Sequence, residues 1–258
     1  MWTLAVYTIK GGVGKTATAV NIAAEAARAG WRVLLWDLDP QGASGFYLRT
    51  EGKAKSTGQK LVEGSKTLMD VALRTDQPRL HVVPSDMSYR NLDLFLDAMS
   101  NSKKRLGEMI QPAEDEYNLV VLDCPPGLSL LSENILRGSD GIMVPVIPTT
   151  LSLRTLEQLN QFIKEQKLDI ELWPFLSMID SRKRLHRDIE ESFDKIAPKR
   201  LKTEIPLSVI VERMGIERAP VRAYAPTSRP AKAFADLWYE VSLRLPPYYR
   251  TLAARRSR

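Results

Sequence analysis

The segment KGGVGKT, residues 10–16, is the feature that most narrows what this chain can fold into. It stands between an apolar, β-rich segment at residues 3–9 and an alanine-rich segment at residues 15–29, which Gly30 ends as a C-terminal cap. A strand, a glycine-rich turn and a helix in this order form an anion site, because the N–H groups of the loop and of the helix N-terminus point at the same place. The order therefore predicts a phosphate-binding loop.

The rest of the chain continues the alternation of strand and helix patterns. Strand patterns occur at residues 31–39, 80–85, 117–123, 141–148 and 170–179, and helical patterns occur near residues 128–137, 152–167 and 229–245. This alternation predicts the α/β class, with a doubly wound, mainly parallel sheet and helices on both faces, as in P-loop NTPases. We expect one P-loop ATPase domain over residues 1–245, a basic C-terminal tail over residues 246–258, and an irregular surface connection over residues 51–66.

The residues of the loop have distinct expected roles. Gly11, Gly12 and Gly14 let the backbone turn tightly and come close to a phosphate. Lys15 supplies positive charge to the β and γ phosphates of a nucleotide. The Thr16 hydroxyl is the expected magnesium ligand.

Three aspartates follow the ends of apolar strand patterns. Asp37 and Asp39 lie in DLDPQG, and Asp123 ends the apolar run of NLVVLDCPP. A single aspartate after a strand is commonly a turn residue or a helix cap. However, carboxylates at the carboxyl ends of parallel strands face the same crevice as the glycine loop. We expect a metal site formed by Thr16, Asp37, Asp39 and Asp123, with Asp39 also placed to orient an attacking water.

Composition and charge limit the function classes. The chain holds one cysteine, Cys124, and two histidines far apart in sequence, which excludes an intramolecular disulfide and disfavours a zinc site. No run of about 18 apolar residues occurs and the N-terminus lacks a secretory pattern, so we expect a cytoplasmic protein. The net charge is +6, but residues 181–258 hold 18 basic and 9 acidic residues, a net of +9. This asymmetry favours a polyanionic partner, nucleic acid or anionic membrane; a solvated basic surface is the alternative.

Several motifs together resemble a known family. KGGVGKT, DLDPQG and the Asp-x-Pro-Pro of DCPPG, in this order, resemble the ParA/Soj group of deviant-P-loop ATPases, which are relatives of MinD. VPVIPTTLSLRTLEQL, SMIDSRKRL, TEIPLSVI and YAPTSRPAKAFADLWYEV also resemble this group, so the resemblance covers nearly the whole chain. It implies an ATPase with ATP and Mg²⁺ as cofactors. It also implies that Lys10 crosses the interface of an ATP-dependent homodimer and touches the partner subunit's nucleotide.

The resemblance implies two further groups of site residues. The catalytic residues are Lys10, Lys15 and Asp39. The nucleotide contacts are Lys10, Gly11, Gly12, Val13, Gly14, Lys15, Thr16, Ala17, Met178 and Pro206. Ala17 departs from the pattern, because the group usually has a second threonine there, and we expect weaker nucleotide binding as a result. Leu207 to Ile210 stand where some members have an Arg-x-x-Arg that contributes to DNA contact.

The leading hypothesis is an ATP-dependent partitioning or positioning ATPase, cytoplasmic and associated with the nucleoid. Its ATP-bound dimer would bind DNA without sequence preference, and a ParB-like adaptor protein on a plasmid, chromosome or protein cargo would stimulate hydrolysis. The expected DNA contacts are Arg182, Lys183, Arg184, Arg187, Arg213, Arg218, Arg222, Arg229 and Lys232. No helix-turn-helix segment precedes the first strand, so specific operator binding is not expected.

Two other functions were weighed against the leading hypothesis. A MinD-like, ATP-dependent membrane-associated regulator needs a C-terminal amphipathic helix with several large apolar residues. The sequence YYRTLAARRSR is a poor anchor of this kind, so we expect no stable membrane anchor. An electron-donor ATPase like the nitrogenase iron protein needs two cysteines per subunit, and Cys124 alone does not supply them.

Overall fold

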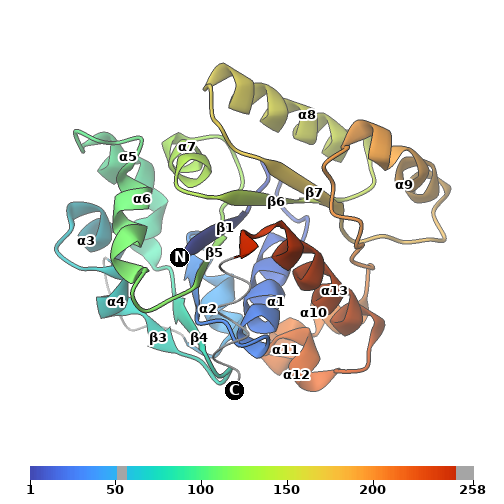
Figure 1. Cartoon of the computed structure of the whole chain (residues 1–258), viewed down its shortest axis with the longest axis horizontal. Coiled ribbons are helices and arrows are strands. Elements are labelled where there is room, and N and C mark those ends of the chain that lie inside the picture. Colours follow the sequence, from blue (N-terminus) through green and yellow to red (C-terminus); the bar gives the residue numbers. More distant parts are fainter. Residues whose placement is uncertain (51–56, 248–258) are drawn as a thin grey trace.

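The computed structural model describes residues 1–50 and 57–247, which fold around a seven-stranded sheet in the order β3-β4-β2-β5-β1-β6-β7 (Figure 1). The strands are β1 (Trp2–Val6), β2 (Val33–Asp37), β3 (Leu73–Arg74), β4 (Leu80–Val83), β5 (Leu119–Asp123), β6 (Gly141–Val146) and β7 (Leu172–Leu176). All neighbouring pairs are parallel except β3 with β4, which are antiparallel. The predicted α/β class and mainly parallel sheet are therefore confirmed.

The three central strands bring acidic residues to one edge of the sheet. Every residue of β2, β5 and β1 is buried, as expected for strands of a parallel sheet that is covered on both faces. The register places Asp123 of β5 opposite Asp37 of β2 and opposite Val6 of β1. The carboxyl ends of the three strands therefore meet where β1 enters the glycine loop.

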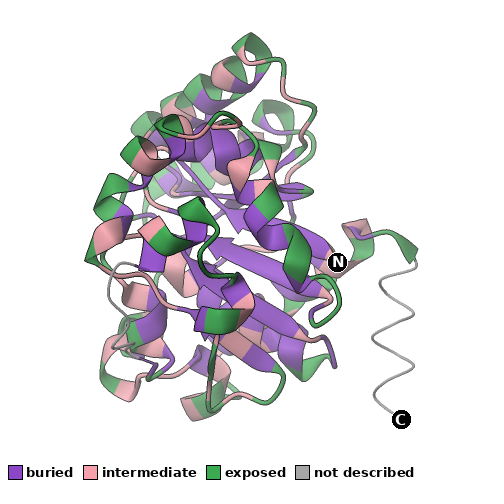
Figure 2. Cartoon of the chain, turned by 90° about the vertical axis from the view of Figure 1, so that its left-hand side faces the viewer, coloured by how far each residue is buried: buried purple, intermediate pink, exposed green. Residues whose placement is uncertain are grey.

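Helices cover both faces of the sheet, and their inner surfaces are buried (Figure 1, Figure 2). The helices are α1 (Lys15–Arg28), α2 (Ala43–Tyr47), α3 (Thr57–Glu63), α4 (Leu68–Val71), α5 (Leu92–Asp97), α6 (Arg105–Ile110), α7 (Leu130–Arg137), α8 (Thr150–Glu165), α9 (Arg184–Ile196), α10 (Val209–Glu212), α11 (Met214–Glu217), α12 (Val221–Tyr224) and α13 (Arg229–Arg244). One core packs α1 and α10 to α13 against the sheet, with Ile22 and Phe234 fully enclosed. The other core packs α3 to α9 on the opposite face, around Leu61, Ile135 and Phe193.

The sequence-based expectation for residues 51–66 is wrong for part of that segment. Residues 57–63 form α3, whose Leu61 and Val62 are buried in the core. A helix this short gains little from propensity and is stabilised by tertiary packing, which a local pattern does not reveal. Residues 51–56 and residues 248–258 of the predicted tail lie outside the described residues. The predicted division into a domain and a tail stays a prediction.

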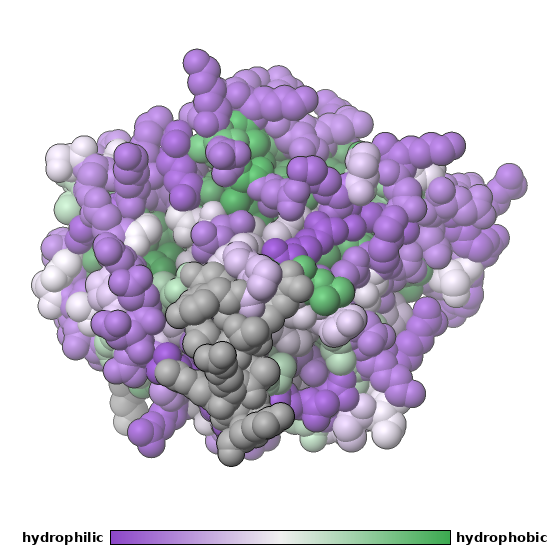
Figure 3. All heavy atoms as spheres, in the orientation of Figure 1, coloured by the Kyte–Doolittle hydropathy of each residue, from purple (hydrophilic) through white to green (hydrophobic). Residues whose placement is uncertain are grey.

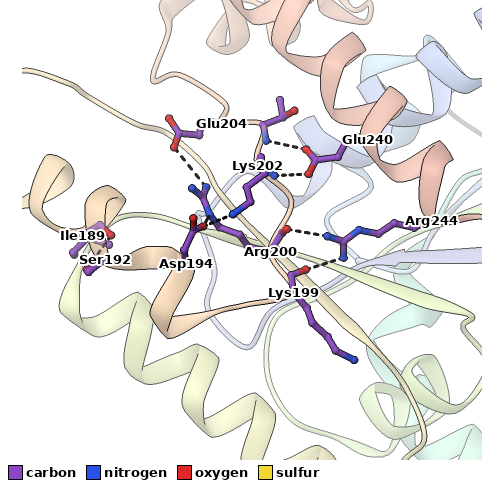
Figure 4. Close-up of polar contacts among 10 residues, drawn as sticks. Ile189, Ser192, Asp194, Lys199, Arg200, Lys202, Glu204, Glu240 and Arg244 are labelled. Atoms are coloured by element: carbon purple, nitrogen blue, oxygen red, sulfur yellow. Dashed lines mark hydrogen bonds and ion pairs between the residues drawn. The ribbon is translucent and has the colours of Figure 1, made fainter.

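The edge strand β7 is covered by the chain that follows α9. The backbone N–H of Leu201 donates to the carbonyl of Pro174, and that of Ile205 donates to Leu176. Figure 4 shows how this segment is fixed: Arg200 and Lys202 bind Asp194 of α9, Glu240 accepts from two backbone N–H groups, and Arg244 donates to two carbonyls. The edge is thereby protected from pairing with other chains. The same contacts hold the backbone of the residues that lead to Pro206.

The face of the molecule seen in Figure 3 is mostly hydrophilic, with apolar side chains gathered below α8. A groove of about 370 Å³ lies between α8 and the end of α9, where Leu156, Ile163 and Ile196 line it.

Across residues 1–50 and 57–247, no helix has the length and the apolar character needed to span a bilayer.

Candidate nucleotide-binding site

The glycine loop connects β1 to the first turn of α1. Gly12 and Gly14 have φ values of 71° and 91°, in the left-handed region that glycine adopts without steric cost. A Cβ atom on Gly14 would lie 3.2 Å from Ser177 Oγ, and this hydroxyl donates to the carbonyl of Val13 at 3.0 Å. The loop is therefore pinned from the β7 side, with the N-terminus of α1 directly after it. This geometry suits a bound phosphate.

Lys15 lies at the centre of the loop. Its side chain is buried, and the ammonium Nζ donates to the carbonyl of Lys10 at 3.2 Å. Burial lowers the pKa of Lys15, while the nearby carboxylates of Asp123 and Asp39 oppose that shift. The loop thus holds a desolvated cation next to the place where phosphates would lie.

The side chain of Lys10 reaches α8. Its ammonium lies 3.3 Å from the Ser152 hydroxyl, in the first turn of that helix. Ser152 is itself held by Thr149, the N-cap of α8, whose hydroxyl lies 3.0 Å from that of Ser152. The two lysines of the loop therefore have separate environments within one subunit.

Asp37 and Asp123 form a fully buried pair bridged by a serine. The Ser44 hydroxyl donates to Asp123 Oδ2 at 2.7 Å, and the Ser44 backbone N–H donates to Asp37 Oδ2 at 3.0 Å. Burial raises the pKa of Asp123 to about 6, and the hydrogen bond from Ser44 limits that rise. Burial and the neighbouring Asp123 raise the pKa of Asp37 well above its usual range.

One carboxylate oxygen of the Asp37–Asp123 pair lacks a hydrogen bond, and this oxygen is a candidate metal ligand. Asp123 Oδ1 is buried without a hydrogen-bond partner among the described residues. An unpaired buried carboxylate oxygen beside Thr16 fits a hard, oxygen-seeking cation such as Mg²⁺, reached directly or through its water shell. The residues present thus fit the expected metal.

Asp39 lies apart from the buried pair. It is partly exposed, its Oδ1 accepts the backbone N–H of Gln41 at 3.0 Å, and its own N–H donates to Asp37 Oδ1. Among the described residues, no group of three or more Asp, Glu, His or Cys side chains converges to hold a metal. Asp37, Asp39 and Asp123 therefore do not form a three-carboxylate cage, and any cation here would need oxygens from Thr16, water and phosphate.

A small, mostly apolar pocket of about 50 Å³ borders the loop. Met178 and Pro206 line it together with Gly14 and Ala17. Ile179 and Pro206 form a parallel bridge, which brings the segment after β7 beside the segment that follows residue 204. Two of the expected nucleotide contacts, Met178 and Pro206, therefore lie together beside the glycine loop.

Several functional candidates were not found from the sequence. Ser44, Ser152 and Ser177 each contact the loop or its carboxylates from a different element. Ser44 comes two residues after DLDPQG, and this position is the one sequence feature that could have indicated its role. The other two are identified only by tertiary contact.

The basic residues expected to contact DNA fall in two separate regions. Four lie at or just before the start of α9, and five lie from α10 to α13, which Figure 1 shows at the right and at the bottom of the molecule. Arg182 makes a bidentate contact with Asp180, and Arg213 pairs with Glu217. Arg222 pairs with Glu25, donates to the Ala231 carbonyl, and is only 21% exposed. Several of the expected DNA contacts are therefore already paired with carboxylates, and their role in DNA binding stays a prediction.

Comparisons with known proteins agree with this geometry. A family model described as an AAA domain matches residues 1–172. The sporulation initiation inhibitor protein Soj of Bacillus subtilis is 32% identical over 93% of this chain and 97% of its own length. The chromosome partitioning protein ParA of Myxococcus xanthus is 30% identical over 92% of this chain and 87% of its own length.

Solved structures extend the agreement to the fold. The septum site-determining protein MinD of Pyrococcus horikoshii, solved as a complex with Mg-ADP, superposes with a TM-score of 0.80 at 23% identity. The match covers 96% of this chain and 98% of that one. The AAA-domain model matches residues 1–172, and Soj and ParA are 32% and 30% identical over 93% and 92% of this chain. Together these matches place the chain in a family of nucleotide hydrolases. The chain belongs to the AAA-domain P-loop NTPases and, within them, to the Soj/ParA family of ATPases.

Proposed function

We propose that this protein binds Mg-ATP at the glycine loop and works as a partitioning or positioning ATPase. The observation that carries the proposal is the buried Asp37–Asp123 pair, with one unpaired oxygen, beside the desolvated Lys15. A site that buries two carboxylates and a lysine without a complete hydrogen-bond set is costly unless a ligand completes it. A magnesium-bound triphosphate supplies both the cation and the anion that this arrangement lacks.

The proposed roles follow from position. Backbone N–H groups of the glycine loop and the ammonium of Lys15 bind the phosphates, and the backbone N–H of Ala17 remains as a donor where the threonine hydroxyl is missing. Thr16 and Asp123 would hold the metal, with Asp37 acting through Ser44. The metal, when bound, neutralises charge that develops on the phosphates. Asp39, the more exposed carboxylate, orients or deprotonates the attacking water.

The second lysine gives the proposed site its dependence on dimerisation. Lys10 reaches the nucleotide of the partner subunit, which requires it to leave Ser152. A cation from each subunit then faces the charge that develops during hydrolysis. ATP favours the dimer because it provides the ligand for both lysines, and hydrolysis removes that ligand.

The cargo side of the proposal comes from the relatives and from charge. Soj and ParA are named for sporulation control and chromosome partitioning. We infer that the ATP-bound dimer binds DNA non-specifically on the nucleoid, and that a ParB-like adaptor carrying a plasmid, chromosome or protein cargo stimulates hydrolysis. The excess of basic residues after residue 180 supports the DNA component.

Two lysine substitutions test the nucleotide site and the dimer separately. Lys15→Ala should abolish tight ATP binding, because the cation on the β and γ phosphates is lost. Lys10→Ala should leave ATP binding by the monomer within about threefold and abolish the ATP-dependent dimer. Fluorescent-nucleotide titration measures the first property, and size exclusion with light scattering measures the second. If both variants fail in the same assay to the same extent, Lys10 acts within its own subunit and the cross-subunit role is wrong.

A further inference from the structure

Three arginines from distant parts of the sequence surround one pocket. Arg28 lies in the last turn of α1, Arg79 lies in the turn before β4, and Arg222 lies in α12. The pocket measures about 520 Å³, and its other walls include Pro78 and Pro220. It lies at the amino end of β4, whereas the glycine loop lies at the carboxyl end of β1.

The charges of this arginine pocket do not balance. Glu25 is the one acidic residue among the described residues that line it, and its side chain is 8% exposed. Arg222 Nε binds Glu25 Oε1, and Arg28 Nε lies 3.6 Å from Glu25 Oε2. One carboxylate thus faces three guanidinium groups, which leaves an excess of two positive charges.

The three arginines differ in how firmly they are held. Arg222 is fixed, because a second nitrogen, Nη2, donates to the carbonyl of Ala231 at 2.9 Å. Arg28 is 67% exposed, and among residues 1–50 and 57–247 its guanidinium contacts only Glu25. Arg79 is exposed, and no hydrogen bond or ion pair of its side chain occurs within residues 1–50 and 57–247. The pocket therefore combines Arg222, whose guanidinium is fixed, with Arg28 and Arg79, whose guanidinium groups are exposed and can contact a ligand.

The backbone at Arg79 adds an independent observation. Its φ is 64°, in the left-handed region where glycine or asparagine would be less strained. The turn is fixed on both sides, because the Leu80 N–H donates to Gln77 and the Arg79 carbonyl accepts from Val33. An exposed arginine that lines a cationic pocket and keeps a left-handed backbone supports a role for its side chain.

We infer that this arginine pocket binds phosphate groups of the DNA backbone. The inference rests on the DNA component of the proposed function, and it adds Arg28 and Arg79, from the first third of the chain, to the expected contact Arg222. Guanidinium groups match phosphate oxygens in bidentate geometry. Free guanidinium groups with a positive excess attract a polyanion, and such contacts carry no sequence information.

The test compares single charge reversals at Arg79 and Arg74, on the β3–β4 hairpin, and at Arg28 of α1. Arg79→Glu and Arg28→Glu change the pocket, and Arg74→Glu, on the exposed strand β3 outside the pocket, makes the same charge change. Arg79→Gly removes the side chain and suits the left-handed backbone, so it guards against misfolding. Retention of a random-sequence duplex by the ATP-bound protein is measured by fluorescence anisotropy over a series of salt concentrations, with ATP-dependent dimerisation measured in parallel.

Both pocket reversals should weaken DNA retention by about tenfold or more and reduce the salt slope by about one per lost phosphate. Arg79→Gly should weaken it less, and Arg74→Glu should stay within about threefold of the wild type, with dimerisation unchanged in all four. If the wild type retains DNA and Arg79→Glu behaves like Arg74→Glu, the pocket assignment is overturned and the proposed function stands. If the wild type dimerises with ATP and retains no DNA, the DNA component of the proposed function is wrong and the pocket assignment fails with it.

Discussion

At the scale of single residues, the three aspartates of the site differ in burial, and burial separates their expected roles. Asp37 and Asp123 are fully buried and share Ser44, whereas Asp39 is partly exposed and its carboxylate accepts the nearby backbone N–H of Gln41. A carboxylate that must exchange protons with water needs access to solvent, and a carboxylate that serves a metal does not.

This difference gives a prediction for Asp39→Ala. The variant should bind ATP and dimerise as the wild type does, but turn over about 10²-fold more slowly or worse, because it lacks the group that orients water. Phosphate release under saturating ATP measures turnover, and light scattering measures the dimer. A loss of dimerisation as severe as that of Lys10→Ala would assign Asp39 a structural role. Asp123→Ala serves as the contrast, because it should weaken both Mg-ATP binding and turnover.

His186 carries a second prediction at this scale, because it is buried and its Nδ1 accepts the backbone N–H of Asp180 at 3.1 Å. Burial lowers the pKa of His186, and the charge of Lys183 lowers it further. The unfolded chain therefore binds more protons than the folded chain just below the ordinary pKa of about 6.5, so the free energy of unfolding falls as pH drops through that range.

His186→Asn should reduce this acid sensitivity, because the asparagine amide oxygen accepts the same hydrogen bond and does not titrate. Between about pH 7.5 and pH 5.5 the wild type should lose about 2–4 °C more of its Tm than the variant, if the bond contributes about 1 kcal/mol. Thermal melts at both pH values measure this. The pKa of His81 is also lowered. Because the wild type and the variant both contain His81, its contribution to the loss of Tm is the same in each. Equal losses of Tm would show that His186 does not titrate in this range.

The residues expected at the nucleotide site could be predicted from the sequence, whereas the residues that hold them in place could not. Lys15, Asp37 and Asp123 occupy adjoining positions because a motif fixes local backbone and parallel strands align their carboxyl ends. Ser44 and Ser152 could not be assigned, because their partners lie on elements whose packing no local pattern specifies.

At the scale of elements, two arginines join α2 to α11. One follows each helix, and each donates hydrogen bonds to backbone carbonyls of the other helix or of the residue after it. Arg49, directly after α2, donates to the carbonyls of Glu217 at 2.9 Å and Arg218 at 3.2 Å. Arg218 donates to the Phe46 carbonyl at 3.1 Å and lies 4.6 Å above the Phe46 ring. Because α2 also carries Ser44, these contacts link the carboxylate pair to the segment that leads to α13.

Arg49→Ala should loosen this link. We expect backbone hydrogen exchange over residues 214–224 to become about fivefold faster, which corresponds to ~1 kcal/mol, while the glycine loop is unaffected. Arg49 has a φ of 56°, so Arg49→Gly is the matched control: it removes the same hydrogen bonds and relieves the backbone. Faster exchange in both variants identifies the side chain. Faster exchange in the alanine variant alone would identify backbone strain.

Elements with a strong pattern were predictable, and short elements were not. β2 and β5 read as unbroken apolar runs, and α13 has a long periodic face ended by prolines. β3 has two residues, both exposed, and exists because it pairs with β4. Pairing of this kind depends on the fold already being formed, so no local pattern indicates it.

At the scale of the whole molecule, the positive charge is distributed rather than concentrated. The sequence showed an excess of basic residues after residue 180, but α9 and α10–α13 hold them in different places, and many are paired with carboxylates. A linear charge count measures neither pairing nor position. Several weak regions summed over two subunits still favour a polyanion, because the affinity rises steeply with the number of phosphates contacted.

Distributed charge predicts a steep dependence of DNA binding on salt. If the ATP-bound dimer neutralises four phosphates, its affinity for duplex DNA should fall about 150-fold between 50 and 200 mM salt, and should differ little between base sequences. The ADP form should not be retained, because it lacks the second subunit's contacts. The same preparation is tested by ATP-dependent sedimentation with anionic liposomes. Liposome binding without DNA retention would reverse the assignment in favour of a MinD-like membrane regulator, since an apolar anchor then supplies affinity that phosphate contacts do not.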